Sequence, residues 1–137
     1  MDIKEFNKET DYEELCDWWR DWGLSVHSKD ALSENGIIIS KDNVNICVGF
    51  IYSTDSYITW FEFITINKKT TKQQREGVLE KLGSVMVEKA KSMGFKLIMC
   101  FGLEQQKKTS PILSKWREEN IGDIVINNVS QYYKIIN

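Results

Sequence analysis

Several residue types are scarce in this chain, and each scarcity excludes a class of protein. The 137 residues include one proline and eight glycines, which excludes a collagen-like or proline-rich segment. No run of about 18 apolar residues is present, so we expect no transmembrane helix and no membrane partner. Residues 1–5 lack a basic stretch followed by an apolar one, so we expect no signal peptide and a cytoplasmic protein.

Cysteine and histidine are also few. Cys16, Cys47 and Cys100 are an odd number, none lies in a C-x-x-C pair, and each lies within an apolar segment, so we expect reduced, buried thiols. His27 is the only histidine and no cluster of metal ligands accompanies it, so we expect no metal. The charge, 18 basic against 20 acidic residues, argues against a general nucleic-acid binder.

The remaining composition is that of an ordinary globular protein. Apolar residues make up 42% and charged residues 28% of the chain. A chain of this length buries roughly two thirds of its unfolded surface and needs no disulfide to fold. We therefore predict a single domain over residues 1–137.

Hydrophobic periodicity and turn residues predict the elements of the first half. A short strand is expected at 2–7 and a helix at about 11–22, begun by a capping box of Thr10 and Glu13 and ended by Gly23. Residues 24–35 are irregular, with one turn near 30–32. Three segments rich in β-branched residues follow, separated by turns, and should form an antiparallel meander at 36–40, 44–52 and 57–66.

The second half mixes helices with strands. The capping box Thr71-x-x-Gln74 and apolar residues at helical spacing predict one helix over about 71–93, followed by a strand at 95–101. Ser110-Pro111 opens a helix to about 120, and Asn127-Asn128 joins a hairpin of 124–126 and 129–136. The fold class is therefore α/β (α+β): a mixed, mostly antiparallel sheet of about six to seven strands with about four helices, in which 57–101 joins two parallel strands.

Two segments carry a family resemblance. Glu62-Phe63-Ile64-Thr65-Ile66-Asn67 resembles the Glu-Leu-x-x-Val-x-Pro strand of the GNAT superfamily of acyl-CoA-dependent N-acyltransferases. Gln74-Arg75-Glu76-Gly77-Val78-Leu79 resembles its Q/R-x-x-G-x-G/A helix opening. The element order is also the GNAT order. The sequence departs from the GNAT motifs at two places: Asn67-Lys68 stands where a proline is usual, and Leu79 replaces the second small residue.

A narrower resemblance is to short GNAT-like proteins of bacteriophage and bacterial genomes. These proteins share Trp18-Trp19, then Trp22-Gly23, and a turn like residues 52–56. The resemblance implies a phage or bacterial source and, for a phage protein, the host cytoplasm. It brings no defined substrate.

The GNAT resemblance implies an acetyl-CoA site at the start of the helix over 71–93. A helix N-terminus suits a pyrophosphate, and lysine and arginine side chains add positive charge. Leu79 lies on the apolar stripe, where its side chain can pack inward. The expected binding residues are Lys72, Gln74, Arg75, Glu76 and Gly77 at the helix opening, with the backbone of Ile64, Thr65 and Ile66 for the pantetheine arm.

The same resemblance suggests catalytic residues. Glu62 interrupts an otherwise apolar strand face and matches the GNAT base; the alternatives are that this face is solvated at one end, or that Glu62 pairs with a lysine or arginine. Trp116 stands where a tyrosine acid is common, and an indole is no proton donor at working pH. Tyr132 is our candidate acid; Tyr133, Tyr52 and Ser114 remain alternatives, as do unassisted departure of the thiolate and the absence of turnover.

The first helix is the expected wall of the acceptor pocket. Its tryptophans are core residues on one interpretation and acceptor-binding residues on the other; the candidates are Trp18, Trp19, Trp22 and Tyr52. The predicted function is acyl transfer from acetyl-CoA to an amine of a small molecule or protein. Two alternatives are a non-catalytic interaction module and a phage protein directed at a host protein or a nucleobase. A homodimer is compatible with the resemblance.

Overall fold

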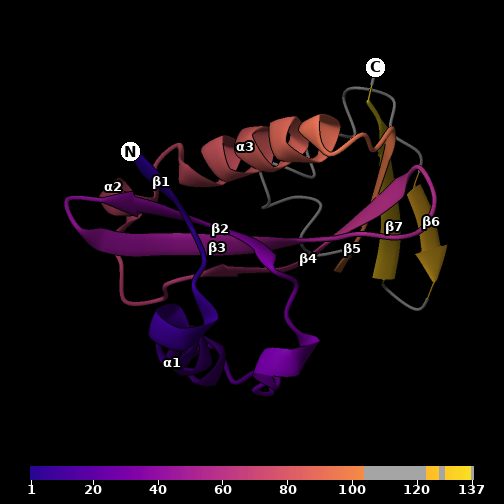
Figure 1. Ribbon diagram of the computed structural model, residues 1–137. Coiled ribbons are helices and arrows are strands. Elements are labelled where there is room, and N and C mark those ends of the chain that lie inside the picture. Colours follow the sequence, from indigo (N-terminus) through magenta and orange to yellow (C-terminus); the bar gives the residue numbers. More distant parts are fainter. Residues whose placement is uncertain (104–122, 127–128, 137) are drawn as a thin grey trace. The chain divides into compact units, whose positions relative to one another are not determined.

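The computed structural model describes residues 1–103, 123–126 and 129–136. The strands follow the order β1-β2-β3-β4-β5-β7-β6 in one seven-stranded sheet, which confirms the predicted class of mixed sheet and helices (Figure 1). The elements are β1 (Asp2–Glu5), α1 (Lys8–Asp21), the 3-10 helix η1 (Lys29–Ala31), β2 (Asn35–Lys41), β3 (Val44–Tyr52), β4 (Ile58–Ile66), α2 (Lys72–Arg75), α3 (Val78–Ser92), β5 (Leu97–Leu103), β6 (Asp123–Ile126) and β7 (Val129–Ile135).

The chain divides into two compact units, which are described separately. Unit 1 comprises Met1–Phe50 and Phe63–Leu82, and unit 2 comprises Ile51–Glu62 and Gly83–Asn137. Strands β3 and β4 and helix α3 contribute residues to both units. That residues 1–137 form one domain stays a prediction.

Helix α1 of unit 1 begins earlier than the sequence suggested. The Asn7 side chain accepts hydrogen bonds from the backbone N–H groups of Glu9 and Thr10, at 2.9 and 3.3 Å. The backbone N–H of Asn7 in turn donates to the Asp11 carboxylate at 2.8 Å. The predicted Thr10–Glu13 capping box is therefore wrong: an asparagine three residues earlier satisfies the orphan donors, and Thr10 lies within the helix.

The end of α1 agrees with the prediction. Gly23 has φ +70°. Its N–H donates to the carbonyl of Arg20, and the Leu24 N–H donates to the carbonyl of Trp19. These two bonds form a Schellman motif, which closes the helix because glycine adopts positive φ without strain.

Strands β1 and β2 form an antiparallel pair, with Asp2 opposite Ser40 and Glu5 opposite Ile37. The turn from β2 to β3 has positive φ at both Asp42 and Asn43, as a two-residue hairpin turn requires. The core of unit 1 is apolar and includes Leu15, Cys16, Trp18, Trp19, Ile38, Ile39, Ile46, Val48 and Phe50.

The single helix predicted over 71–93 is wrong. The chain instead forms the one-turn helix α2, breaks at Glu76 and Gly77, and starts again as α3. Gly77 has φ +71°, which an α-helix cannot accommodate. The capping box of Thr71 and Gln74 is present as predicted, but it caps α2. Sequence periodicity missed the break because Val78 and Leu82 keep the apolar stripe in phase.

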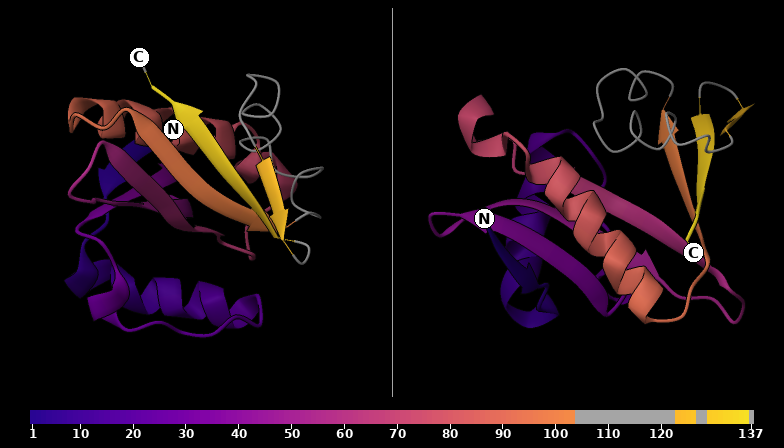
Figure 2. Two further views of the ribbon diagram at one scale, coloured as in Figure 1. Left: turned by 90° about the vertical axis from the view of Figure 1, so that its right-hand side faces the viewer. Right: turned by 90° about the horizontal axis from the view of Figure 1, so that it is seen from above.

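Unit 2 contains the parallel pair. Ile58, Thr59 and Trp60 of β4 lie opposite Leu97, Ile98 and Met99 of β5, which confirms the predicted parallel strands. Strand β7 then pairs antiparallel with both β5 and β6, and Ile126 opposite Val129 confirms the predicted hairpin (Figure 2).

Two predictions concern other parts of the chain. The helix expected from Ser110 to about 120 lies outside the described residues. Among the helices that the structure describes, none has the length and apolar character needed to cross a membrane.

Candidate functional site

The break between α2 and α3 displays backbone donors in unit 1. The first hydrogen bond of α3 runs from the Lys81 N–H to the Gly77 carbonyl at 3.1 Å. The N–H groups of Val78, Leu79 and Glu80 therefore have no acceptor within α3, and they carry the positive end of the helix dipole. Gly77 precedes them with no side chain. This is the backbone arrangement that binds phosphates in other proteins.

Arg75 holds the loop that leads into α2. Its Nε donates to the Thr70 hydroxyl at 2.9 Å, and one terminal nitrogen donates to the carbonyls of Lys68, at 2.7 Å, and of Thr70. Three acceptors in one loop bind one guanidinium, so Arg75 fixes the loop's shape. The sequence predicted Arg75 as an anion-binding residue; in the structure its Nε and one terminal nitrogen donate to the loop.

Two further contacts fix the same segment. The Gln74 side chain accepts from the Thr71 N–H at 2.7 Å as part of the capping box. The Lys41 ammonium, at the end of β2, donates to the Glu76 carbonyl at 2.8 Å. Lys41 thus places a cation beside the turn at Gly77. Sequence analysis missed Lys41, because its position in a hairpin turn gives no signal of this long-range contact.

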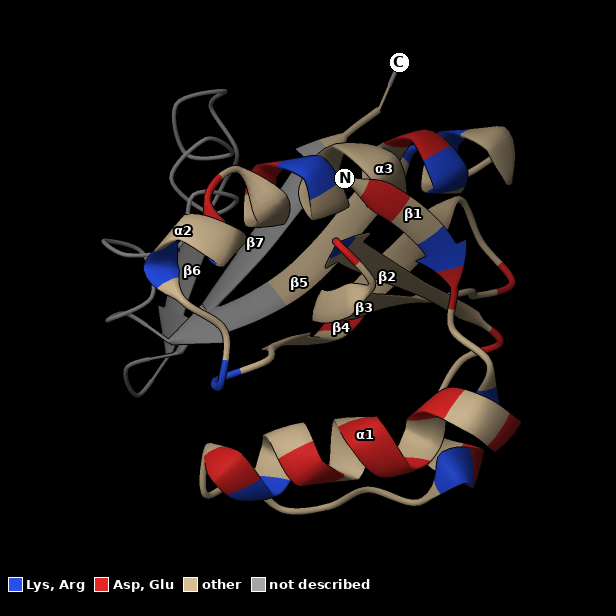
Figure 3. Cartoon of the chain, turned by 90° about the vertical axis from the view of Figure 1, so that its left-hand side faces the viewer, with Lys and Arg blue, Asp and Glu red and all other residues tan. Residues whose placement is uncertain are grey.

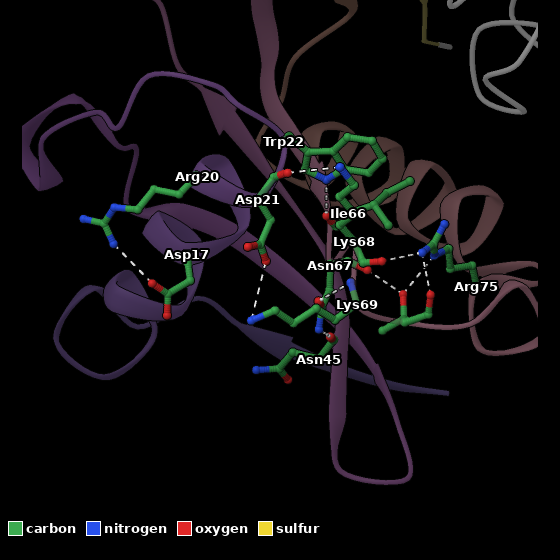
Figure 4. A network of polar contacts seen from close by, with 11 residues as sticks. Asp17, Arg20, Asp21, Trp22, Asn45, Ile66, Asn67, Lys68, Lys69 and Arg75 are labelled. Atoms are coloured by element: carbon green, nitrogen blue, oxygen red, sulfur yellow. Dashed lines mark hydrogen bonds and ion pairs between the residues drawn. The ribbon is translucent and has the colours of Figure 1, made fainter.

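A second network joins the end of α1 to the loop after β4 (Figure 4). The Trp22 indole Nε1 donates to the Ile66 carbonyl at 2.8 Å, and the Lys68 ammonium lies 5.0 Å from the centre of the Trp22 ring. Lys68 also donates to the Asp21 carbonyl at 3.1 Å, and Lys69 lies 3.7 Å from the Asp21 carboxylate. The cation–π contact and the ion pair are partly exposed, so each contributes modestly.

The three tryptophans of the first helix therefore differ. Trp18 and Trp19 are buried in unit 1, where Trp19 meets the rings of His27 and Phe63 at 5.3 and 5.9 Å between centroids. Trp22 is 43% exposed. Of the three predicted acceptor-binding tryptophans, Trp22 is the one that offers a substantial area to a ligand.

The middle of β4 is distorted at Phe63. Its φ of +55° is unusual for an aromatic residue and marks an irregularity in the strand. After it, Ile64 is 39% exposed, while Thr65 is buried and its hydroxyl donates to the Phe63 carbonyl at 2.8 Å. The Ile66 carbonyl, predicted to meet a pantetheine arm, already accepts from Trp22. Sequence analysis missed Phe63, since no local residue pattern predicts positive φ at phenylalanine.

Glu62 and Cys100 belong to unit 2, near the place where β4 and β5 stop pairing. The parallel register covers three residues of each strand and ends at Trp60 and Met99, and both strands continue within the described chain. Glu62 is half-buried, and burial raises its pKa above the ordinary value. Burial also raises the pKa of Cys100 to about 12, with a further contribution from the charge of Glu62. Cys100 is therefore a thiol at neutral pH.

The other candidates in unit 2 are Tyr52 and Tyr132. Tyr52 ends β3 half-buried, and its carbonyl accepts from the Thr59 hydroxyl at 2.7 Å. The backbone of Tyr132 lies opposite Cys100 in the β5–β7 pair. Tyr132 is therefore on the strand next to that of Cys100. The side chain of Tyr132 lies outside the described part of the chain.

The charges of unit 1 are separated (Figure 3). Acidic residues dominate α1, whereas lysines lie in the loop before α2 and at the start of α2, where Lys72 is exposed. We call the loop that carries Lys68 and Lys69 the basic loop; helix α2 connects it to the α2–α3 turn. Such a loop favours an anionic ligand, and the acidic helix favours a cationic one. Within the described residues, no group of three His, Cys, Asp or Glu side chains is placed to hold a metal ion.

Comparison with solved structures identifies the fold as that of GNAT acetyltransferases. The chain superposes on aminoglycoside 6'-acetyltransferase type Ii with a TM-score of 0.75 and 11% identity, covering 100% of this chain and 98% of that one. An N-acetyltransferase from Staphylococcus aureus Mu50 gives 0.74 and 10%, covering 99% and 98%.

A third similar structure is longer. N-acetylglutamate synthase from Neisseria gonorrhoeae, in complex with coenzyme A and L-arginine, gives a TM-score of 0.74 and 10% identity. The match covers 99% of this chain and 33% of the synthase, so this chain spans about a third of that protein. No protein-family model matches the sequence, and no curated protein matches it.

Proposed function

We propose that this protein transfers an acyl group, most simply acetyl, from acyl-CoA to an amine. The observation that carries the proposal is the α2–α3 break, where Gly77 at φ +71° precedes N–H groups that have no acceptor within α3. Lys41 and the exposed Lys72 supply positive charge in the same unit. The GNAT fold supports the proposal, and the gonococcal synthase with this fold was crystallised with coenzyme A.

The residues of the α2–α3 turn have the chemistry that suits a pyrophosphate. A Cβ added at Gly77 would meet the terminal methyl of Met1 at 3.3 Å, so a residue with a side chain would crowd this turn more than glycine does. Leu79 is half-buried and keeps its backbone N–H. Arg75 acts indirectly, by holding the loop, and Lys72 with the backbone of Gly77 and Val78 would contact the phosphates.

Glu62 is the proposed general base. A raised pKa suits this task, because a base with a pKa nearer the working pH accepts a proton more readily. Glu62 would take a proton from the ammonium, directly or through water. The amine nitrogen then forms a bond to the thioester carbonyl carbon and the carbon–sulfur bond breaks. The nitrogen loses its second proton to water, and the thiolate takes up a proton. The sequence-based candidate Tyr132 is paired with Cys100, on the other face of the strands from Glu62, so water is the proposed donor of that proton.

Calorimetric titration with acetyl-CoA tests the binding half of the proposal. We expect saturable binding that CoA competes for and that weakens in Lys72→Ala, with a smaller salt dependence. Lys4→Ala, an exposed lysine of β1, is the matched control and should bind as the native protein does. No heat of binding at millimolar acetyl-CoA would refute the proposal.

Release of CoA thiol in the presence of amines tests the catalytic half. Glu62→Gln should lower kcat about 100-fold or more, the contribution typical of a general base. Glu88→Gln, an exposed carboxylate of α3 in the same unit, should not. Equal rates in Glu62→Gln and the native protein would remove Glu62 from the mechanism.

A non-catalytic binding module of the same fold, phage-encoded and host-directed, is the second candidate. The observation that favours it is that the Gln74 side-chain oxygen and two nitrogens of Arg75 form hydrogen bonds within the loop. On this alternative, acetyl-CoA would bind without any amine-dependent release of CoA.

A further inference from the structure

The strands of unit 2 have two different faces. Neighbouring residues across a ladder share a face, and so do residues two apart along a strand. One face carries Thr59 and Phe61 of β4 and Ile98 and Cys100 of β5, all of them buried. This is the core side of the unit.

The opposite face is apolar and partly open to solvent. Ile58, Leu97 and Ile135 form one row across three strands, because Leu97 lies opposite both Ile58 and Ile135. Trp60 and Met99 form the next row. The side chains on β4 and β5 are half-buried, whereas Ile135 on β7 is 65% exposed. We call this surface the apolar face: Ile58, Trp60, Leu97, Met99 and Ile135.

A carboxyl group stands at one end of the apolar face. Glu62 lies two residues beyond Trp60 on the same strand, before the distortion at Phe63, so it shares that face. It is half-buried, and it follows the last pair of the β4–β5 ladder. An apolar surface that ends in a single carboxylate complements a cation with an apolar body.

We propose that the apolar face binds the hydrocarbon or aromatic part of the acceptor, an alkyl- or arylammonium ion whose nitrogen lies at Glu62. This inference rests on the proposed acyl transfer and adds the class of acceptor. Four residues from Ile58 to Glu62 span about 13 Å, and three strands span about 10 Å. A six-carbon chain or a phenyl group that extends from Glu62 covers the nearer row, Trp60 and Met99, which begins about 7 Å along the strand from Glu62.

A series of n-alkylamines tests the inference. With acetyl-CoA fixed, kcat/KM for ethylamine, butylamine and hexylamine should rise, by up to about fourfold for each added methylene that leaves water. In Met99→Gln, which makes the side chain beside Trp60 polar, the rise should flatten. Ile3→Gln is the control: Ile3 is 48% exposed on β1, the first strand of the sheet order. It should leave the series unchanged.

Binding of hexylamine without acetyl-CoA, measured by calorimetry, separates the two proposals. Weaker hexylamine binding in Met99→Gln, but no CoA release with any amine, would keep the apolar acceptor site and refute the acyl transfer. CoA release at rates independent of chain length would refute the inference and keep the acyl transfer. Sedimentation gives the remaining outcome: a dimer that Ile135→Ser dissociates would show that a second copy covers the face, and would overturn the inference.

Discussion

Replacing Gly77 by alanine should cost the protein little stability but most of its acetyl-CoA affinity. A residue with a Cβ pays about 1–2 kcal/mol at positive φ. The less flexible unfolded chain returns about 0.4–1 kcal/mol. The net loss is about 1 kcal/mol, since the Met1 methyl at 3.3 Å is the free end of a flexible side chain and moves easily. For a chain of this size Tm should fall by about 3–5 °C.

Gly23→Ala is the matched control. Gly23 has φ +70° against +71° for Gly77, and nothing lies within 4 Å of its added Cβ. Thermal unfolding without ligand should give the two variants similar losses. Calorimetric titration with acetyl-CoA should then separate them, with Kd about tenfold or more higher in Gly77→Ala and unchanged in Gly23→Ala. Equal affinities in both variants would refute the assignment of the Gly77 turn to phosphate binding.

Three further predictions concern stability and reactivity. Asn7→Ala should lower the free energy of unfolding by about 1 kcal/mol because it removes the cap of α1, whereas Thr10→Ala should change it little. Urea denaturation measures both, and a larger loss in Thr10→Ala than in Asn7→Ala would show that Thr10 is the cap. Because burial raises the pKa of Glu62, the folded state binds its proton more tightly than the unfolded state, so this group's contribution to stability falls as pH rises from its ordinary pKa of 4.5 through the raised value. Glu62→Gln should therefore gain stability relative to the native protein between pH 4.5 and pH 8, and a constant difference would contradict the burial of Glu62. Finally, the three free cysteines are buried, and burial raises the pKa of Cys47 and of Cys100 to about 12, so a thiol reagent at pH 8 should react at the rate of unfolding; fast labelling of the folded protein would contradict the packing.

The sequence predicted the strands well, because each has a strong local signal. Strand β3 runs from Val44 to Tyr52 as expected, and the hairpin of β6 and β7 follows from paired apolar segments around two asparagines. Gly23 ends its helix for a local reason, too: a glycine beyond the last apolar turn is the usual C-terminal signal.

Helix boundaries were harder to predict. Asn7 and Thr10 are both good N-caps, and the choice between them depends on which residues pack inward, not on local preference. The break at Gly77 was hidden by an uninterrupted apolar stripe. Its stabilising contact comes from Lys41, 35 residues earlier in the chain, which no local pattern reveals.

The candidate site was predicted in composition but not in detail. Glu62 lies on β4 and Gly77 directly before α3, and that these residues form a site stays a prediction. The engagement of Arg75 by Lys68 and Thr70, and of the Ile66 carbonyl by Trp22, depends on how the chain folds back on itself. Side-chain chemistry gives the candidates for such contacts; only tertiary structure selects among them.

The contacts of the basic loop differ in how far they reach along the chain, and this sets the order in which they form. Arg75 bonds to residues five and seven positions earlier, whereas Trp22 to Ile66 and Lys68 to Asp21 span 44 and 47 positions. Short loops close at lower entropic cost than long ones. The hydrogen bonds of Arg75 to Lys68 and Thr70 should therefore form before helix α1 docks, and they should persist when α1 detaches locally. Amide hydrogens that depend on the Trp22 contact should then exchange sooner than those of the loop around Arg75.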